Sequence, residues 1–514
     1  MKIELKSIEG STYKMLCSSK GEAHSDAELI IPDTLEDILR ILCCRRQYRI
    51  REKTVSKDTV CICGEVDVTV MYIPESGEGV RVVGTTASFE VNLDAPGADS
   101  TSIAVTKLLS LTVDAKAVNP RKISVSADVY MEQSCYKYVD VCWTEPPSEA
   151  PDKLFFKTQE LKCRSIELVS EKTLSIEDEL DLPEKYLGGD FVKAFSTVKI
   201  AGSEVVGTKL VVKGSAEIEA LYLVSGIPRS ASFSLPFSQL FELPDGCTQP
   251  EVSAAAMITG QYFESFDKKL SADIRAAIQI VCLRERSIRY IIDAYSCKKQ
   301  LGLTRSESRC LTNNEEDSQS RSVHLSYNSD YGAEEILFSS AYAACAEVSE
   351  NEVLIPVTSD IVYKDRNGEL RSCRVRGKAQ FELSSDRKPN EVYVTNVYVS
   401  ASATGNSVNA DIDVAFTMRY LSYGSISMIT EVCETEQNRE RADAALYMCR
   451  CTDGDLWSLA KKYGSDVDLI MLINEIDGIP DDRQQACYPG CHTAFLPHYL
   501  RRSALHEVCE SKLS

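Results

Sequence analysis

The chain contains few histidines and tryptophans, five and two among 514 residues, and few basic side chains relative to its acidic ones. Its 57 Lys and Arg face 77 Asp and Glu, which gives a formal net charge of −20. Recognition of nucleic acid needs clustered Lys and Arg, and adsorption to anionic lipid needs a basic surface. The charge balance therefore excludes nucleic acid as an expected partner and disfavours adsorption to an anionic membrane surface.

Long apolar segments are also missing. No run approaches the roughly 18 residues that a membrane-spanning helix requires. The first residues, MKIELKSIEGSTYKML, contain no apolar core of the kind found in secretory signals. We therefore expect a protein that remains in the cytoplasm and is not inserted in a membrane.

Signatures of catalysis are scarce. The sequence has no phosphate-cradling glycine loop, neither G-x-x-x-x-G-K-[ST] nor G-x-G-x-x-G after a strand. His24 and His324 are expected in loops, whereas His492, His498 and His506 crowd the C-terminal end. No Ser-His or Cys-His pair is therefore predicted in the longer part of the chain. We predict no catalytic residue, no cofactor and no metal site, and hence no enzymatic activity.

Cysteine, in contrast, is abundant, with twenty residues scattered along the chain. Without an export signal these are expected to be reduced thiols, most of them packed as small hydrophobic side chains. Cys43 and Cys44 are adjacent, and Cys61 and Cys63 are one residue apart. Neither spacing is a usual redox or zinc motif.

Internal similarity recurs at a period of about 140 to 150 residues, which is too long for a solenoid and indicates tandem domains. The segments VSADV, LSADI and VNADI, which begin at Val125, Leu270 and Val408, share one pattern. Each alternates apolar and polar residues, as is typical of an antiparallel strand with one buried face. A strand-ending tyrosine and a later phenylalanine are also shared, at Tyr72, Tyr222 and Tyr363, then Phe89, Phe237 and Phe381.

The aspartates of these segments, Asp128, Asp273 and Asp411, fall on the polar side of the alternation. They lie in different repeats, and exposed carboxylates are normal on the solvent face of a strand. We therefore interpret them as surface residues and not as catalytic groups.

The repeats predict a mainly β protein with three tandem antiparallel, sandwich-like domains and a small terminal β-α-α-β domain. The expected ranges are 1–143, 154–297 and 325–432 for the repeats, 446–498 for the terminal domain and 499–514 for a tail.

Three segments between these domains are predicted to be linkers because they are rich in proline, polar or charged residues. They are TEPPSEAPDK at 144–153, the polar stretch 298–324 and the charged stretch 433–445. Within the first repeat, the helical spacing of Leu35, Ile38, Leu39 and Leu42 predicts a short helix.

The terminal domain is expected to begin and end with a strand. The sequence predicts a strand at Leu446–Cys451, a helix capped by Asp455 and ended by Gly464, a second helix at Asp466–Glu475 and a strand at Pro489–Pro497. This order, with the motifs DGDLWSLAKKYG and YPG, resembles a LysM domain over about a tenth of the chain.

The resemblance implies a shallow groove between the loop before the first helix and the loop after the second. Its residues would be Asp453, Gly454, Asp455, Leu456, Ile476, Asp477, Gly478 and Ile479. Grooves of this family bind glycans that contain N-acetylglucosamine. Here the turn reads DGDLW where the family has a Gly-Asp-Thr-Leu sequence, and three aspartates line the rim. A protein partner is therefore favoured, and a glycan stays open; Trp457 is interpreted as helix core.

The terminal domain also holds several sulfur ligands, Cys449, Cys451, Cys487 and Cys491, followed by His492. Pairing of its two strands would bring these groups near one another. Their spacing differs from that of a zinc ribbon, so no metal is predicted there.

The three longer repeats resemble the SPOCS domain of endospore-forming Firmicutes. The resemblance rests on GEVDVTVMY, NPRKISVSADVYM and FSQLFELPDG, at residues 64–72, 119–131 and 237–246, and covers nearly all of residues 1–430. Three such domains followed by one LysM domain are similar to the SipL-type spore coat morphogenetic proteins of clostridia. The resemblance implies a non-enzymatic adaptor in the mother-cell cytoplasm. Such an adaptor docks on the forespore surface through a coat-scaffold ATPase and helps the coat to encase the spore.

Two functions stay open on the sequence. One is this adaptor, with its LysM domain bound to the scaffold ATPase or to other coat proteins. The other is a peptidoglycan- or cortex-binding protein that acts in cell-wall or cortex assembly. Exposed strand edges would permit self-association. The resemblance also suggests that thiols kept reduced during assembly crosslink once the mother cell lyses.

Overall fold

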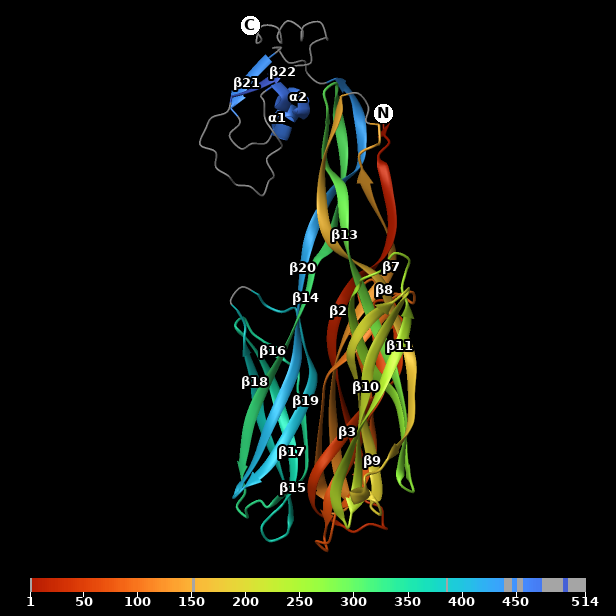
Figure 1. The fold of residues 1–514 in the computed structure, drawn as a ribbon, viewed down its shortest axis with the longest axis vertical. Coiled ribbons are helices and arrows are strands. Elements are labelled where there is room, and N and C mark those ends of the chain that lie inside the picture. Colours follow the sequence, from red (N-terminus) through yellow and green to blue (C-terminus); the bar gives the residue numbers. More distant parts are fainter. Residues whose placement is uncertain are drawn as a thin grey trace.

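The computed structural model describes residues 2–149, 153–384, 387–438, 446–450, 456–473 and 493–497. The structure is mainly β, which agrees with the expected fold class. Figure 1 shows an elongated body in which strands β15 to β19 lie beside the overlapping strands of the first 300 residues at one end. The longest strands continue beyond this part as a narrow stalk, and two short helices lie at its tip.

Residues 6–145 form the first group of strands, which we call unit 1. Its strands are β2 (Lys6–Ile30), β3 (Ile38–Ser56), β4 (Thr59–Pro74), β5 (Arg81–Asp94), β6 (Ile103–Asn119) and β7 (Lys122–Glu145). The meander β3-β4-β5 forms one antiparallel sheet, and β2-β7-β6 forms the other. Apolar side chains of both sheets, such as Val68 of β4 and Val129 of β7, share one core.

The same order of strand pairing occurs in residues 154–296 (unit 2) and 299–438 (unit 3). Unit 2 consists of β8 (Leu154–Asp181), the 3-10 turn η1 (Glu184–Tyr186), β9 (Asp190–Val206), β10 (Lys209–Val224), β11 (Ile227–Glu242), β12 (Glu251–Phe266) and β13 (Lys269–Ser296). Unit 3 consists of β14 (Lys299–Asn328), β15 (Glu335–Ala343), β16 (Glu347–Val348), β17 (Glu352–Lys364), β18 (Leu370–Glu382), β19 (Glu391–Thr404) and β20 (Ser407–Asn438). A short strand, β1 (Lys2–Ile3), adds to β20.

The alternating segments are strands with one buried face, as predicted. In β20, Val408, Ala410 and Ile412 are fully buried, whereas Asp411 between them is exposed. The period of two arises because successive side chains of a strand point to opposite faces.

The shared tyrosines are among the largest fully buried side chains of the chain. Each phenol hydroxyl is hydrogen bonded: Tyr72 donates to the Glu36 carbonyl at 2.9 Å, and Tyr363 meets the Ser329 hydroxyl at 3.0 Å. A buried hydroxyl without a partner would cost about 1–3 kcal/mol, so these contacts allow an aromatic ring to fill each core at the end of its strand.

The predicted helix around Leu39 is wrong. Ile38 begins strand β3, and two of the three register shifts in its pairing with β4 fall near its start, between Ile38 and Arg40 and between Ile41 and Cys43. Each β-bulge inserts an unpaired residue, so the period of two is lost locally. The apolar residues then recur at intervals of three and four, which imitates a helix.

The predicted polar linker at 298–324 is also wrong. These residues belong to β14, which pairs antiparallel with β20 from Lys299 to Asn328. The strand contains few large apolar residues because much of it faces solvent, and only side chains such as Val323 and Leu325 pack against the core of unit 3. Backbone hydrogen bonds to β20 stabilise β14, and the composition of a segment does not show such pairing.

The other two predicted linkers overlap strands where the structure describes them: residues 144–145 belong to β7 and residues 433–438 to β20. Strand β7 extends to Glu145 and β8 begins at Leu154, while β20 extends to Asn438. Residues 150–152 and 439–445 lie outside the described residues.

The stalk consists of the ends of three long two-stranded ribbons, β2/β7, β8/β13 and β14/β20. Apolar side chains from several of these strands form one cluster, which contains Ile3, Leu154, Ile291, Ala294, Ile429 and Val432. The hydroxyl of Thr144 in β7 donates to the carbonyl of Ile429 in β20, which links two of the ribbons. The three units are therefore joined along the stalk as well as at their sandwiches.

A glycine facing a phenylalanine recurs in units 1 and 2. Gly64 lies opposite Phe89, and Gly214 lies opposite Phe237, and in both cases a register shift of the neighbouring strand falls at the glycine. A Cβ atom at Gly214 would overlap the Lys199 carbonyl and the Phe237 ring. The absence of a side chain lets the ring lie over the backbone.

We predict that Gly214→Ala lowers the free energy of unfolding by about 1–3 kcal/mol, the usual cost of overpacking. The matched control is Gly202→Ala in β9, where an added Cβ meets no atom within 4 Å. That change should be neutral or slightly stabilising, because it restricts the unfolded chain. Thermal unfolding of both variants tests the prediction, and equal losses would contradict it.

Candidate functional sites at the unit junction and the stalk tip

The aspartates interpreted as surface residues lie in the middle of paired strands. His24 lies opposite Asp128, and His324 lies opposite Asp411. The Nδ1 atoms of the two histidines contact these carboxylates at 2.6 and 2.8 Å, on exposed faces. The expectation that both histidines occupy loops is therefore wrong.

The contact between His24 and Asp128 changes the pKa of the histidine. The hydrogen bond to Asp128 and the charge of Asp26 raise the pKa of His24 above its usual 6.5. Its Nε2 contacts Asp26 at 3.2 Å, so both ring nitrogens face carboxylates. An imidazole held in this way is not positioned as the base of a Ser or Cys nucleophile.

The three meander sheets meet one another on the faces that point away from their own cores. Met71 of unit 1, Leu221 of unit 2 and Val362 of unit 3 belong to one buried cluster, together with Phe195 and Phe338. Met71, Leu221 and Val362 each directly precede the shared tyrosine of their unit. Equivalent surfaces of the three units are therefore buried against one another.

Arg45 of β3 lies inside this junction and contacts both other units. Its guanidinium binds the carboxylate of Glu219 through two hydrogen bonds, at 3.2 and 2.7 Å. The same group lies 4.6 Å from the ring centroid of Phe195 and 5.0 Å from that of Phe338. A planar cation suits both interactions, because it matches a carboxylate edge-on and stacks on aromatic faces.

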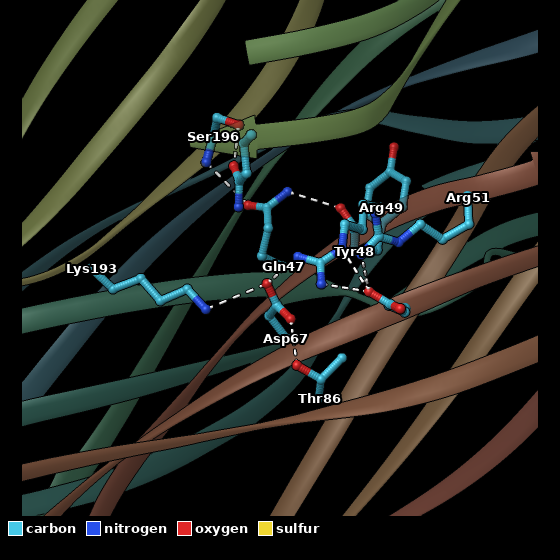
Figure 2. A network of polar contacts seen from close by, with 10 residues as sticks. Gln47, Tyr48, Arg49, Arg51, Asp67, Thr86, Lys193 and Ser196 are labelled. Carbon is cyan, nitrogen blue, oxygen red and sulfur yellow. Dashed lines mark hydrogen bonds and ion pairs between the residues drawn. The ribbon is translucent and has the colours of Figure 1, made fainter. Parts of the chain in front are cut away.

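A polar network extends this contact between units 1 and 2 (Figure 2). The side-chain oxygen of Gln47 accepts from the Ser196 backbone N–H at 3.0 Å. Asp67 accepts from Thr86 at 2.8 Å and from Arg49 at 2.7 Å, and Lys193 of unit 2 lies 3.4 Å away. Buried polar groups that are paired in this way specify one arrangement of the units.

Two cavities lie where units meet. One, near Lys107, Glu132 and Arg419, has a volume of about 10 Å³, and the other, near Cys345 and Tyr393, about 100 Å³. Pockets for small molecules usually measure about 300–1,000 Å³. Neither cavity has the size of a substrate site.

The charged groups beside the smaller cavity are strongly affected by burial. Burial raises the pKa of Glu132, with the charge of Glu391 acting in the same direction, and burial lowers the pKa of Lys107. Lys107 lies over the ring of Tyr393, 4.4 Å from its centroid. These contacts fix unit 1 against unit 3.

The terminal helices pack on the tip of the stalk. They are α1 (Leu456–Tyr463) and α2 (Val467–Ile473), and they lie between the paired strands β21 (Leu446–Arg450) and β22 (Thr493–Pro497) in the chain. Gly464 has a φ of +64°, and the Ser465 N–H bonds to the Ala460 carbonyl at 3.0 Å. This is a Schellman C-cap, so the helix ends at the glycine as predicted.

Helix α1 buries its apolar face against β13. Leu456, Ala460 and Ile470 form a cluster with Tyr295, whose ring lies edge-on to Trp457 at a centroid distance of 4.8 Å. The Tyr295 hydroxyl donates to the Ser465 carbonyl at 2.7 Å.

Asp293 provides the polar part of the same contact. Its carboxylate accepts from the Trp457 indole at 2.8 Å and from the Lys461 ammonium at 2.7 Å. Partial burial alone would raise the pKa of Asp293, but the hydrogen bonds from Lys461 and Trp457 outweigh it and hold the pKa below its usual value. Trp457 thus contacts the stalk and is not confined to its own helix.

Of the predicted groove residues, the structure describes only Leu456, which is buried in the cluster with Tyr295. Asp453, Gly454, Asp455, Ile476, Asp477, Gly478 and Ile479 lie outside the described residues. The sequence analysis missed Asp293 and Tyr295, since both lie in a strand of unit 2 and no periodic pattern marks them.

The fifteen cysteines whose side chains the structure describes are free thiols. Seven are buried, seven are partly buried and Cys142 is exposed, so only about half pack as core residues. Burial raises the pKa of Cys135 to about 11 and that of Cys282 to about 12. Such thiols are protonated at neutral pH and react slowly. The terminal-domain residues Cys451, Cys487, Cys491 and His492, for which no metal is predicted, lie outside the described residues.

These features define a β protein whose three units are fixed by extensive mutual contacts. Residues 37–118 match the family model of the SipL SPOCS domain, a segment that contains the meander sheet of unit 1 and nearly all of β6. The match supports the SipL/SPOCS family and suggests a protein related to sporulation or the spore coat.

No curated protein and no solved structure matches the chain. Among the described residues, no helix is long and apolar enough to cross a bilayer.

We predict that Arg45→Ala lowers the free energy of unfolding by about 3 kcal/mol, because it leaves Glu219 partly buried without its partner. The control is Arg51→Ala. Its side chain is 53 % exposed and its partner Glu65 is also bound by Arg49, so a loss below about 0.5 kcal/mol is expected. Denaturant unfolding measures both; a loss for Arg45→Ala no larger than that of the control would contradict the central role of Arg45.

We predict that Asp293→Ala weakens the docking of α1 by about 2 kcal/mol, the range for hydrogen bonds to a charged group. The chain has two tryptophans, so Trp143→Phe leaves Trp457 as the reporter. Its fluorescence should shift to the red in Asp293→Ala and stay unchanged in Asp181→Ala, at the other end of the ribbon.

Lowering the pH should also weaken the docking of α1 and shift the fluorescence of Trp457 to the red. Because the pKa of Asp293 is depressed in the folded state, its contribution is complete above its ordinary value of 3.8 and is lost as the pH falls through the depressed pKa. A red shift in acid that is identical in the wild type and in Asp293→Ala would argue against this assignment.

Proposed function

We propose that this chain is a spore coat assembly adaptor without enzymatic activity. In this proposal units 1 to 3 are SPOCS-type repeats that recruit or encase coat layers, and residues 446–498 are a LysM domain that docks the protein on the forespore surface. The protein acts in the mother-cell cytoplasm. The observation that carries the proposal is the SPOCS match in unit 1, whose strand pairing recurs in units 2 and 3.

The junction supports a role in binding rather than in chemistry. The units bury equivalent faces against one another, and the two cavities described between them are smaller than substrate sites. Among the described strands, β5, β11 and β18 of the meander sheets each pair with a single neighbouring strand, so one edge of each has no strand partner. Coat proteins or a second copy of this chain could add to such edges by β-augmentation.

The stalk tip favours a protein partner for the terminal domain over a glycan. Glycan grooves gain from an exposed aromatic ring, but the Trp457 indole is engaged by Asp293 and Tyr295. A coat-scaffold ATPase is therefore the proposed partner of the rim at residues 453–456 and 476–479. The alternative is a peptidoglycan- or cortex-binding protein, with the same rim bound to an N-acetylglucosamine glycan.

We expect a fluorescent fusion of the full chain to form a shell around the developing forespore. A chain that ends at Asn438 should remain diffuse in the mother cell, because it lacks the docking domain. Ile476→Glu together with Ile479→Glu should have the same effect if the rim binds the partner. Asp181→Ala, at the exposed end of β8, is the matched control and should keep the shell.

Binding assays on the full chain separate the two candidates. If the full chain binds the coat-scaffold protein from sporulating cells and the Ile476→Glu/Ile479→Glu variant does not, the result supports the adaptor function. Retention on purified peptidoglycan with no shell around the forespore would overturn it and favour the cortex-binding function.

A further inference from the structure

Two cysteines and a glutamate lie together on the outer face of the unit 1 meander. Cys61 and Cys63 occupy alternate positions of β4, so their side chains share one face, opposite to the buried Val60 and Ile62. Glu90 of β5 is the direct cross-strand partner of Cys63. The two sulfur atoms are 3.7 Å apart, and one carboxylate oxygen lies within 4.8 Å of both.

We propose that Cys61, Cys63 and Glu90 bind one thiophilic divalent cation, of which zinc is the representative. Two thiolates bound to zinc at about 2.3 Å in tetrahedral geometry are about 3.8 Å apart, which the observed sulfur separation matches. A carboxylate oxygen would lie about 3.5 Å from each sulfur, and because it already lies within 4.8 Å of both, the Glu90 side chain has to move by at most about 1.3 Å. Its three side-chain torsions allow this, since the residue is exposed.

Neighbouring groups support the same assignment. The Asn92 amide donates to Glu90 at 2.8 Å, and this contact holds one carboxylate oxygen so that the other can face the thiols. The pair is partly buried but borders exposed residues, so an ion can reach it and a water molecule can complete the coordination.

A disulfide is the competing fate of two adjacent thiols, and the strand disfavours it. Alternate residues of a strand are about 6.6 Å apart along its axis. A disulfide needs Cβ atoms about 3.5–4.5 Å apart, so β4 would have to distort between its two hydrogen-bonded neighbours, β3 and β5. Coordination of a metal needs no such change.

The two cysteines are not repeated in the other units, and counted from Tyr363 their positions in unit 3 are occupied by Glu352 and Leu354. Counted from the shared tyrosines, the positions of Cys61 and Cys63 are occupied by Val211 and Lys213 in unit 2. The structural role of the strand therefore does not require cysteine, and the ligands are additional to the fold.

Binding should release protons. Zinc binds cysteine as the thiolate, so each thiol that coordinates the ion has to lose its proton. A cation displaces this proton when it binds, and affinity for zinc should rise from pH 6 to pH 8.

The test uses the purified, reduced full chain with zinc chloride as the probe. Alkylation of each cysteine is followed by peptide mass spectrometry, which separates this pair from the cysteines of the terminal domain. Zinc should slow the labelling of Cys61 and Cys63 at least tenfold and leave the exposed Cys142 unaffected. Cadmium should add a thiolate charge-transfer band that is weaker in Cys61→Ser/Cys63→Ser than in the wild type.

Single variants decide whether the three residues act together. Cys61→Ser should abolish the zinc protection of Cys63, and Glu90→Gln should raise the zinc concentration needed by at least about tenfold, as outer-shell changes alone often do. Cys142→Ser is the control and should change nothing. Labelling rates of Cys61 and Cys63 that are independent of zinc, or full protection of Cys63 in Cys61→Ser, would overturn the proposal.

Discussion

The arrangement of the molecule depends on the burial of three meander sheets against one another, with Arg45 at their junction. A meander that packed only on its own core would alternate between buried and exposed residues. Strand β4 does so at its beginning, but from Val66 to Ile73 nearly every residue is buried. The outer face of this half is covered by units 2 and 3, so each unit completes the hydrophobic burial of its neighbours.

This burial on both faces explains the polar residues at the junction. Asp67 lies within the apolar run of β4 and would be costly there without partners. Arg49 and Thr86 of its own unit and Lys193 of unit 2 supply them. Removing unit 2 would therefore expose apolar area and also leave a carboxylate short of a cation. Neighbouring units are coupled by both effects, and the junction has one favoured geometry.

The sequence predicted the parts of the fold that local patterns determine. Alternation in Val408–Met418 identified a strand with one buried face, and the glycine at position 464 identified the end of a helix. Local pattern failed at β3, where two bulges imitate a helix, and at β14, where backbone pairing to β20 stabilises a polar strand.

The candidate sites were less predictable because their residues are distant in the chain. Arg45 and Glu219 are 174 residues apart, and Asp293 and Trp457 are 164 apart. Cys61 and Cys63 were visible as a pair, but their unusual spacing excluded them from known zinc motifs. Only the register of β4 against β5 places Glu90 beside them. A ligand that comes from a neighbouring strand leaves no fixed spacing in the sequence.

The long strands connect the junction mechanically to the stalk tip. Strand β13 has 28 residues, which at about 3.3 Å per residue gives roughly 90 Å of continuous strand. Its lower part contributes Ile274 to the core of unit 2, and its upper end carries Asp293 and Tyr295. A force applied to the terminal helices along the stalk would load the whole ladder between β8 and β13 at once, instead of opening its hydrogen bonds one by one. The protein is proposed to bind the forespore surface at its stalk tip and coat proteins along its units. Such a ladder keeps the tip and the units at a fixed separation while both are bound.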